Sequence, residues 1–200
     1  MAALTGASGC EYGLRLVEEL LAGGAAVDLI VSKAGLLILE EEAGLRLGGD
    51  QRGALRRALE ARRRVDADAL ERLACYGADE LTAPAASGSS RRRAMVVCPC
   101  SMGTLARIAS GASGNLIERA ADCMLKERRP LIVVPRETPL GVIHLENMLR
   151  LARAGAVVLP AMPAFYTKPE KISHLVDFVV GKILDSLNID NNLYQRWKQH

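Results

Sequence analysis

The sequence predicts a single doubly wound α/β domain, in which helices cover both faces of a parallel sheet. Three observations support this fold class. The chain has 200 residues, a length that suits one domain. Half of the residues are hydrophobic and 24% are charged, which is ordinary for a soluble globular protein. Short, continuous apolar runs alternate along the chain with segments of helical spacing, as expected for strands that are buried on both faces.

Five apolar runs are the predicted strands. They are MAAL (1–4), AVDLIV (26–31), AMVVCP (94–99), LIVVP (131–135) and AVVLP (156–160). Each run is short and continuous rather than alternating, which is typical of a parallel sheet. The runs therefore predict a sheet with both faces covered.

Helices are predicted between and after these strands. The first has apolar residues on one face and ends at the pair Gly23–Gly24. Ser32 and Met102 each follow a strand and open a further helix, and two more are expected over residues 144–154 and 169–187. We place the domain at residues 1–187. The tail at 188–200 holds Tyr194 and Trp197, and we expect it to dock on a neighbouring subunit.

The charged segment between residues 45 and 94 has weaker periodicity. We expect one or two surface helices and a crossing loop there, because charge runs usually mark a solvated face. An RNA-binding patch is the alternative reading of its arginines at 56, 57 and 62–64. No aromatic residues interleave with these arginines, and single-stranded recognition generally needs stacking surfaces. The net charge is only +3, so the sequence favours no nucleic-acid partner.

Cysteine and histidine usage predicts a cytoplasmic protein without a metal centre. The five cysteines lack the spacing of a disulfide framework, and the chain starts without a signal-peptide pattern. Cys98 and Cys100 are expected to be buried small apolar residues, since no second pair stands at zinc spacing. The three histidines form no ligand motif. No apolar run reaches the length of a membrane span.

Chemistry-bearing residues follow four of the predicted strands. The stretches are TGASG, SKAG, CPCSMGT and PRETP, and the carboxyl ends of parallel strands surround one ligand crevice. Ser101, Gly103 and Thr104 open a helix with hydroxyls and unpaired amides, a natural phosphate seat. Arg136 and Glu137 end an apolar strand. A cation beside a carboxyl there suits a reaction on a phosphate ligand, because one stabilises negative charge and the other moves a proton.

Several long motifs, in order over most of the chain, resemble the flavin prenyltransferases of the UbiX family. They are TGASGCEYGLRL, VSKA, CPCSMGTLARIASG, NLIERAADCMLKERRPLIVVPRETPL, HLENM and PAFYTKP. The resemblance implies a flavodoxin-like Rossmann fold and transfer of a dimethylallyl group from dimethylallyl phosphate to N5 and C6 of reduced FMN. It also implies a homododecamer that works without metal. The product, prenylated FMN, is the cofactor of UbiD-type decarboxylases.

The same resemblance assigns site residues. The implied flavin contacts are Gly6, Ala7, Ser8, Ser32, Ser101, Met102, Gly103, Thr104 and Arg136. The implied prenyl-phosphate contacts are Arg119, Lys126, Tyr166, Lys182 and Trp197, with Trp197 supplied by a neighbouring chain. The implied catalytic residues are Ser8, Glu42, Lys126 and Glu137. Glu137 matches the carboxyl that protonates the leaving phosphate, and Glu42 with Ser8 matches the pair that removes a proton at ring closure. Lys182 stands where the family commonly has arginine, so a forked contact becomes a point charge.

Two other functions are compatible with a flavin-binding fold. The related flavin-dependent cysteine decarboxylases carry a PxMN-type signature, whereas this chain reads PAMPAFY, with Pro163 in place of the asparagine. A flavin carrier without enzymatic activity would need the flavin seat but not the basic residues Arg119, Lys126 and Lys182. The sequence therefore favours prenyl transfer over both alternatives.

Overall fold

Six parallel strands form one sheet in the computed structural model, which describes residues 1–45 and 51–197. The strands are β1 (Ala2–Leu4), β2 (Val27–Val31), β3 (Leu73–Gly77), β4 (Met95–Cys100), β5 (Leu131–Pro135) and β6 (Val157–Val158). Their spatial order is β3-β2-β1-β4-β5-β6. This is the order of a doubly wound Rossmann sheet, in which the chain turns from one side of β1 to the other between β3 and β4. The predicted fold class is confirmed.

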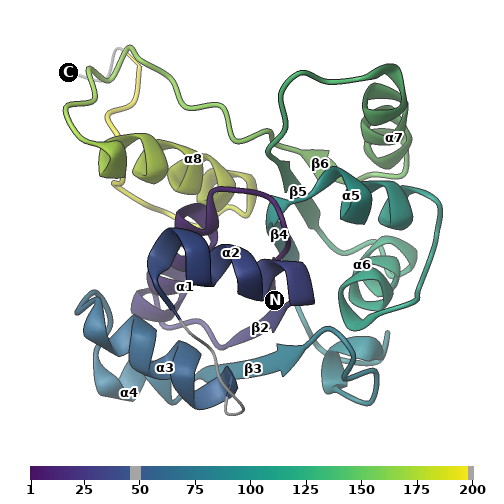
Figure 1. Ribbon diagram of the computed structural model, residues 1–200, viewed down its shortest axis with the longest axis horizontal. Helices are drawn as coiled ribbons and strands as arrows, with labels where there is room; N and C mark the ends of the chain where they lie inside the picture. Colours follow the sequence, from purple (N-terminus) through teal and green to yellow (C-terminus); the bar gives the residue numbers. More distant parts are fainter. Residues whose placement is uncertain (46–50, 198–200) are drawn as a thin grey trace.

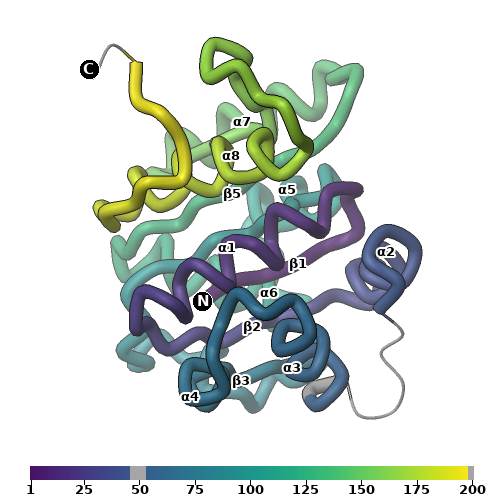
Figure 2. Tube along the Cα trace, turned by 90° about the vertical axis from the view of Figure 1, so that its left-hand side faces the viewer, coloured from purple at the N-terminus to yellow at the C-terminus, as the bar shows by residue number. Residues whose placement is uncertain are grey.

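Helices cover both faces of this sheet (Figure 1). One face carries α1 (Cys10–Ala22), α3 (Gln51–Ala61), α4 (Ala67–Leu70) and α8 (Ile172–Ser186). The other face carries α5 (Met102–Ala109), α6 (Leu116–Lys126) and α7 (Val142–Arg153). The helix α2 (Lys33–Ala43) packs beside α1, and a short 3-10 helix, η1 (Pro84–Ala86), precedes β4. Figure 2 shows the sheet between these two layers, with α1 on the near side.

The central strands are buried on both faces, which explains why their sequences are continuous apolar runs. In β4, Met95 and Val97 face the cluster under α5 and α6, whereas Val96 and Cys98 face the cluster under α8. All four side chains are at most 1% exposed. Burying an apolar side chain of this size contributes about 1.5 to 3 kcal/mol, so these strands hold the two helix layers together.

The segment between residues 45 and 94 differs from its prediction. The structure confirms two helices, α3 and α4, but it adds the strand β3, which the sequence analysis did not predict. Only Cys75 of this strand is fully buried, because β3 lies at the edge of the sheet. Its sequence, LACYG, therefore lacks the long apolar run of a central strand. At the opposite edge, β6 is shorter than predicted, with two residues.

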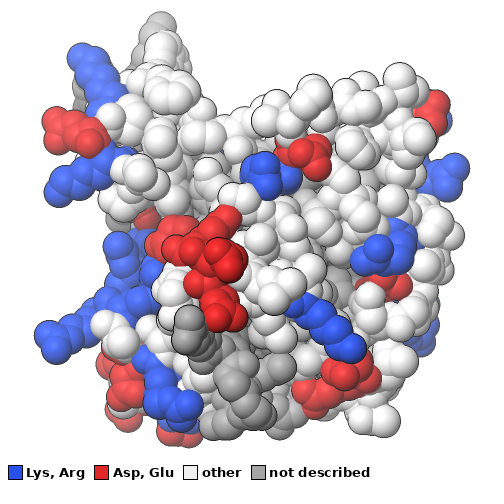
Figure 3. Space-filling model, viewed as in Figure 1, with Lys and Arg blue, Asp and Glu red and all other residues white. Residues whose placement is uncertain are grey.

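Ion pairs hold the charged helix α3 to α1. Arg62 donates to Glu11 through Nη1 at 2.9 Å and also pairs with Glu18, whose side chain is fully buried. Arg56 pairs with Glu71 in the same way on the surface. Several arginines of the charged segment thus have acidic partners within the chain. Figure 3 shows basic and acidic side chains close together along this side of the molecule.

The cysteines and two histidines have structural roles. All five cysteines are buried, and burial raises the pKa of Cys100 to about 12. The predicted burial of Cys98 and Cys100 is confirmed. His144 and His174 each accept a backbone hydrogen bond at the start of a helix, from Gly141 and Glu170. No helix in the described ranges is long and apolar enough to cross a lipid bilayer.

Candidate flavin site

A cavity of about 490 Å³ opens at the carboxyl ends of the central strands. Four residues predicted to contact flavin line it: Gly6, Ser32, Ser101 and Thr104. They follow β1, β2 and β4, three neighbouring strands, so parallel pairing brings them to one edge. The structure thus brings four of the nine predicted flavin contacts to one cavity, whereas Ala7, Ser8, Met102, Gly103 and Arg136 do not line it.

Hydrogen bonds fix the loops around this cavity. The Thr5 hydroxyl donates to the Pro99 carbonyl at 2.8 Å and accepts from the Ser101 amide at 2.7 Å, which joins the ends of β1 and β4. The Ser101 side chain then caps α5 by accepting from the Thr104 amide. Ser32 caps α2 in the same way, accepting from Gly35 at 3.0 Å. The other first-turn amides of both helices have no acceptor within their helix and can bind an anion.

The start of α1 is arranged differently, because a side chain already binds its amides. Gly9 has a φ of +102°, a left-handed turn that leads into the helix. Glu42, at the end of α2, accepts from the Gly9 amide at 2.8 Å and from the Cys10 amide at 3.0 Å. Burial opposes ionisation of Glu42, but hydrogen bonds from the Ser8 side chain and these two amides outweigh it and lower its pKa. Glu42 therefore lies at the turn that contains Ser8. Figure 3 shows acidic side chains gathered over α2.

Arg136 and Glu137 stand at the end of β5, next to the same loop. The Arg136 Nε donates to the Ser8 carbonyl at 3.2 Å, so it links β5 to the turn after β1. Both residues border a second cavity of about 290 Å³. Its remaining lining is mostly apolar and consists of Pro135, Thr138, Leu140, Met148, Pro160, Ala161 and Met162. This edge of the crevice therefore combines a guanidinium, a carboxyl and an apolar wall.

Aromatic side chains from the chain's end gather around Tyr166. Its ring packs edge-on against Trp197 at 5.0 Å and against Phe178 of α8 at 6.0 Å. Lys182 lies one turn further along α8, with Nζ 4.0 Å from Asp185. Tyr166 and Trp197 thus lie beside the middle of α8, and Lys182 stands one turn further along that helix.

The C-terminal tail packs on its own chain in this structure. The Tyr194 hydroxyl donates to Asp185 at 2.5 Å, and Arg196 binds the same carboxylate at 2.8 Å. Trp197 contacts Tyr166 of the same chain. The predicted docking of the tail on a neighbouring subunit stays a prediction.

Arg119 and Lys126 are not part of the crevice within one chain. Both lie on α6, whose first turn borders the flavin cavity through Ile117. Lys126 ends the helix about 15 Å further on, by the rise of 1.5 Å per residue, and pairs with Glu127. Arg119 donates to the Ala86 carbonyl at 3.0 Å and pairs with Asp122. One chain alone therefore does not bring these two cations to Glu137.

The cavity also contains polar residues that the sequence analysis did not assign to the site. They are Lys33, Asp79, Arg107 and Asn115. Asp79 follows β3, and the sequence analysis did not assign it to the site because it did not predict this strand. Lys33 stands inside the quoted motif VSKA and could have been inferred from its place after Ser32. Arg107 comes more than one turn after the start of α5, and the sequence alone does not show that its side chain reaches the cavity.

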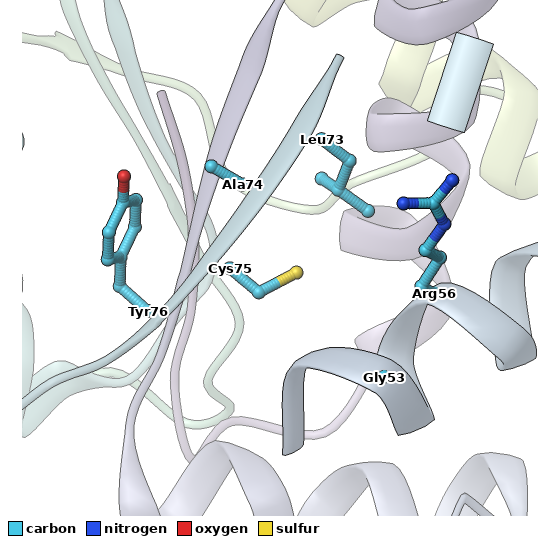
Figure 4. A pocket seen from close by; sticks show the side chains of 6 residues that line it. All are labelled: Gly53, Arg56, Leu73, Ala74, Cys75 and Tyr76. Carbon is cyan, nitrogen blue, oxygen red and sulfur yellow. The ribbon is translucent and has the colours of Figure 1, made fainter. Parts of the chain in front are cut away.

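A further cavity, of about 330 Å³, lies between α3 and β3 (Figure 4). Leu73 and Cys75 point from the strand toward α3, while Tyr76 points to the opposite face. It shares no lining residue with the two cavities at the carboxyl ends. It is therefore separate from the candidate site.

Comparisons with known proteins agree on one family. A family model described as Flavoprotein matches residues 1–184. The flavin prenyltransferase UbiX of Halalkalibacterium halodurans is 50% identical over 194 residues, which cover 97% of this chain and 90% of the relative. The Pseudomonas aeruginosa flavin prenyltransferase UbiX is 48% identical over 199 residues, covering 99% and 93%.

Solved structures give the same result. The crystal structure of AnUbiX (PadA1) in complex with FMN and dimethylallyl pyrophosphate matches with a TM-score of 0.85 and 38% identity, over 100% of this chain and 96% of that chain. A dodecameric FMN-dependent Ubix-like decarboxylase from Escherichia coli O157:H7 matches over 100% of both chains, with a TM-score of 0.83 and 35% identity. A PPC decarboxylase mutant, at 18% identity and a TM-score of 0.53, shares the fold alone. The chain belongs to the UbiX family of flavin prenyltransferases.

Proposed function

We propose that this chain transfers a dimethylallyl group from dimethylallyl phosphate to N5 and C6 of reduced FMN, with Ser8, Glu42 and Glu137 moving the protons. The observation that carries the proposal is that Glu42 binds the Gly9 and Cys10 amides, next to Ser8 at the turn after β1, with Arg136 bound to the same turn. Gly6 of this turn lines the larger cavity, and Arg136 and Glu137 line the smaller one. The proposed base, acid and anion-binding groups therefore lie at the same edge of the sheet.

The residues around the larger cavity fit a flavin mononucleotide. Gly6 approaches α2 so closely that an added Cβ would lie 2.5 Å from the Cβ of Ala34, so the turn presents backbone rather than side chains. The capped helix starts at Ser32 and Ser101 offer amides and hydroxyls to a phosphate. When bound and reduced, FMN supplies the electron-rich nitrogen that an allylic carbon needs.

The chain's own residues then act on the leaving group and the protons. The carbon–oxygen bond of the allylic phosphate breaks as the carbon–N5 bond forms, and Glu137 donates a proton to the departing phosphate. Tyr166 and Lys182 stabilise its negative charge. At ring closure the double bond of the prenyl group would gain the proton that Glu137 gave to the phosphate, its other carbon would bond to C6, and C6 would lose a proton. Ser8 relays this lost proton to Glu42, whose pKa is lowered by its hydrogen bonds. Holding both reactants in one crevice contributes much of the rate, since oriented groups react at high effective concentration.

Arg119 and Lys126 enter this proposal from a neighbouring copy. Within their own chain they pair with Asp122 and Glu127, and neither lines the cavity that Glu137 borders. The dodecameric assembly of the Escherichia coli structure supports a site built at subunit junctions. We propose the same assembly here, a cytoplasmic location, and delivery of prenylated FMN to a UbiD-type decarboxylase.

The test is the mass of the flavin after reaction. Purified protein, reduced FMN and dimethylallyl phosphate are combined without oxygen and with a chelator present, and the flavin is extracted. Wild type should yield flavin heavier by one five-carbon unit, and Glu137→Gln and Glu42→Gln should lose or stall this conversion. Glu41→Gln, on the exposed side of α2, serves as the matched control and should react like wild type. Unchanged FMN in the wild-type reaction, despite tight binding, would overturn prenyl transfer.

A further inference from the structure

We propose that Arg107 binds the phosphate end of the flavin and makes this chain selective for FMN over riboflavin, with the buried Glu118 as its positioning residue. The proposal rests on the proposed function, because it takes the flavin to occupy the cavity at Ser32 and Ser101. It adds a specificity-determining residue to that site.

Arg107 reaches back over the first turn of its own helix. It lines the larger cavity together with Ser101 and Thr104. Its Nη2 donates to the Thr104 hydroxyl at 3.4 Å, and its Nη1 lies 3.5 Å from the point where a Cβ on Gly103 would stand. The side chain is 52% exposed, so the end of the guanidinium can meet a ligand. The cation therefore stands beside the unpaired amides of α5.

Glu118, in the first turn of α6, holds the Arg107 side chain in this position. Its side chain is only 2% exposed and accepts from the Arg107 Nε, from the Asn115 side chain at 2.7 Å and from the Gly114 amide at 2.9 Å. Because Nε is bound to this buried carboxylate and Nη2 donates to Thr104, the planar guanidinium is held at the wall of the cavity that both residues line. Arginine suits this task, since its fork binds a carboxylate on one side and a phosphate on the other.

The charge distribution around the crevice indicates where the phosphate binds. Four helices start there. Glu42 already occupies the amides of α1, and the Ala78 carbonyl, Asn115 and Glu118 accept the amides at the start of α6. The starts of α2 and α5 remain available for an anion. Among the described lining residues of this cavity, Lys33 and Arg107 are cations and Asp79 is the carboxylate. A phosphate monoester, which carries up to two negative charges, is the part of FMN that matches these groups.

The inference is tested by comparing two ligands that differ in the phosphate alone. Dissociation constants of oxidised FMN and riboflavin are measured by quenching of flavin fluorescence. Wild type should prefer FMN, and Arg107→Met should weaken FMN binding by about tenfold or more while leaving riboflavin binding unchanged. Arg107→Lys should keep part of the preference, because the charge remains without the fork. Arg150→Met, an exposed arginine on α7, is the control and should bind both flavins like wild type.

Glu118→Gln tests the positioning role separately. The amide still accepts hydrogen bonds, but the guanidinium loses its ion pair, so the preference for FMN should fall between wild type and Arg107→Met. Circular dichroism establishes that each variant is folded. If Arg107→Met and Arg107→Lys lose FMN and riboflavin binding equally, the arginine has a structural role alone. If both variants bind the two flavins like wild type, the arginine has no role in binding. Either result would overturn the proposal. Wild-type protein that binds neither flavin would overturn the proposed function itself.

Discussion

Glu42 should stabilise the fold as well as accept a proton, and the substitution Glu42→Gln measures this contribution. The carboxylate accepts two backbone hydrogen bonds at the start of α1, from Gly9 and Cys10. A negative charge at a helix start contributes about 0.3 to 1 kcal/mol, and hydrogen bonds to a charged group exceed neutral ones by a similar amount. Glutamine keeps one acceptor oxygen and loses the charge. We therefore expect a loss of about 1 to 2 kcal/mol in the free energy of unfolding.

Urea denaturation at neutral pH measures this loss. The protein and flavin concentrations are kept fixed, because assembly and flavin binding each change the apparent free energy of unfolding. The pKa of Glu42 is lower in the folded protein than in the unfolded chain. Its contribution to the free energy of unfolding is therefore fully present above the pKa of the unfolded chain, and it is lost as the pH falls through the lowered pKa of the folded state. The difference between wild type and Glu42→Gln should therefore shrink in acid. A neutral-pH loss within about 0.5 kcal/mol, the range of an ordinary surface change such as Glu41→Gln, would refute the reasoning.

Three further predictions concern other parts of the molecule. Among the described residues, Arg62→Met leaves the buried Glu18 with the more distant cations Arg15 and Arg64, at 3.7 and 3.6 Å, so urea denaturation should show a loss of about 3 kcal/mol in the free energy of unfolding. Gly6→Ala forces α2 from the turn after β1, so FMN affinity should fall on the order of tenfold, whereas Gly141→Ala at the start of α7 should bind normally. Cys98 and Cys100 should resist iodoacetamide at pH 8 in the folded protein and react after denaturation, as peptide mass spectrometry would show, because burial raises both pKa values. Rapid labelling of either thiol in the folded state would contradict this last expectation.

The sequence predicted the central strands and the loops that follow them, because burial on both faces leaves a strong apolar signal. It missed β3, an edge strand in which only Cys75 is fully buried, and with it Asp79 in the cavity lining. Edge strands need few apolar residues, so their sequences resemble those of loops. The partners of Arg107 also depend on the turn between α5 and α6, which brings Glu118 back to α5. A spacing of eleven residues carries no sign of that contact.

Arg119 and Lys126 show a different limit of sequence reasoning. Their motif resembles the family's, yet within one chain the direction of α6 carries Lys126 away from the crevice. A helix that follows a strand in this fold runs back toward the amino ends of the sheet. Sequence similarity identifies such residues without saying which copy of the chain uses them.

The packing of Trp197 against Tyr166 gives the protein a built-in optical probe. The sequence contains one tryptophan. This residue is 64% exposed, and its ring packs edge-on against a tyrosine proposed to bind the prenyl phosphate. When the protein is excited at a wavelength that only tryptophan absorbs, all of the emission therefore comes from Trp197. A flavin bound nearby would accept energy from the excited tryptophan and lower its emission. A prenyl phosphate bound next to Tyr166 would change the surroundings of the Trp197 ring. Binding of each substrate can thus be followed in time by emission intensity and wavelength, without a label or a substitution.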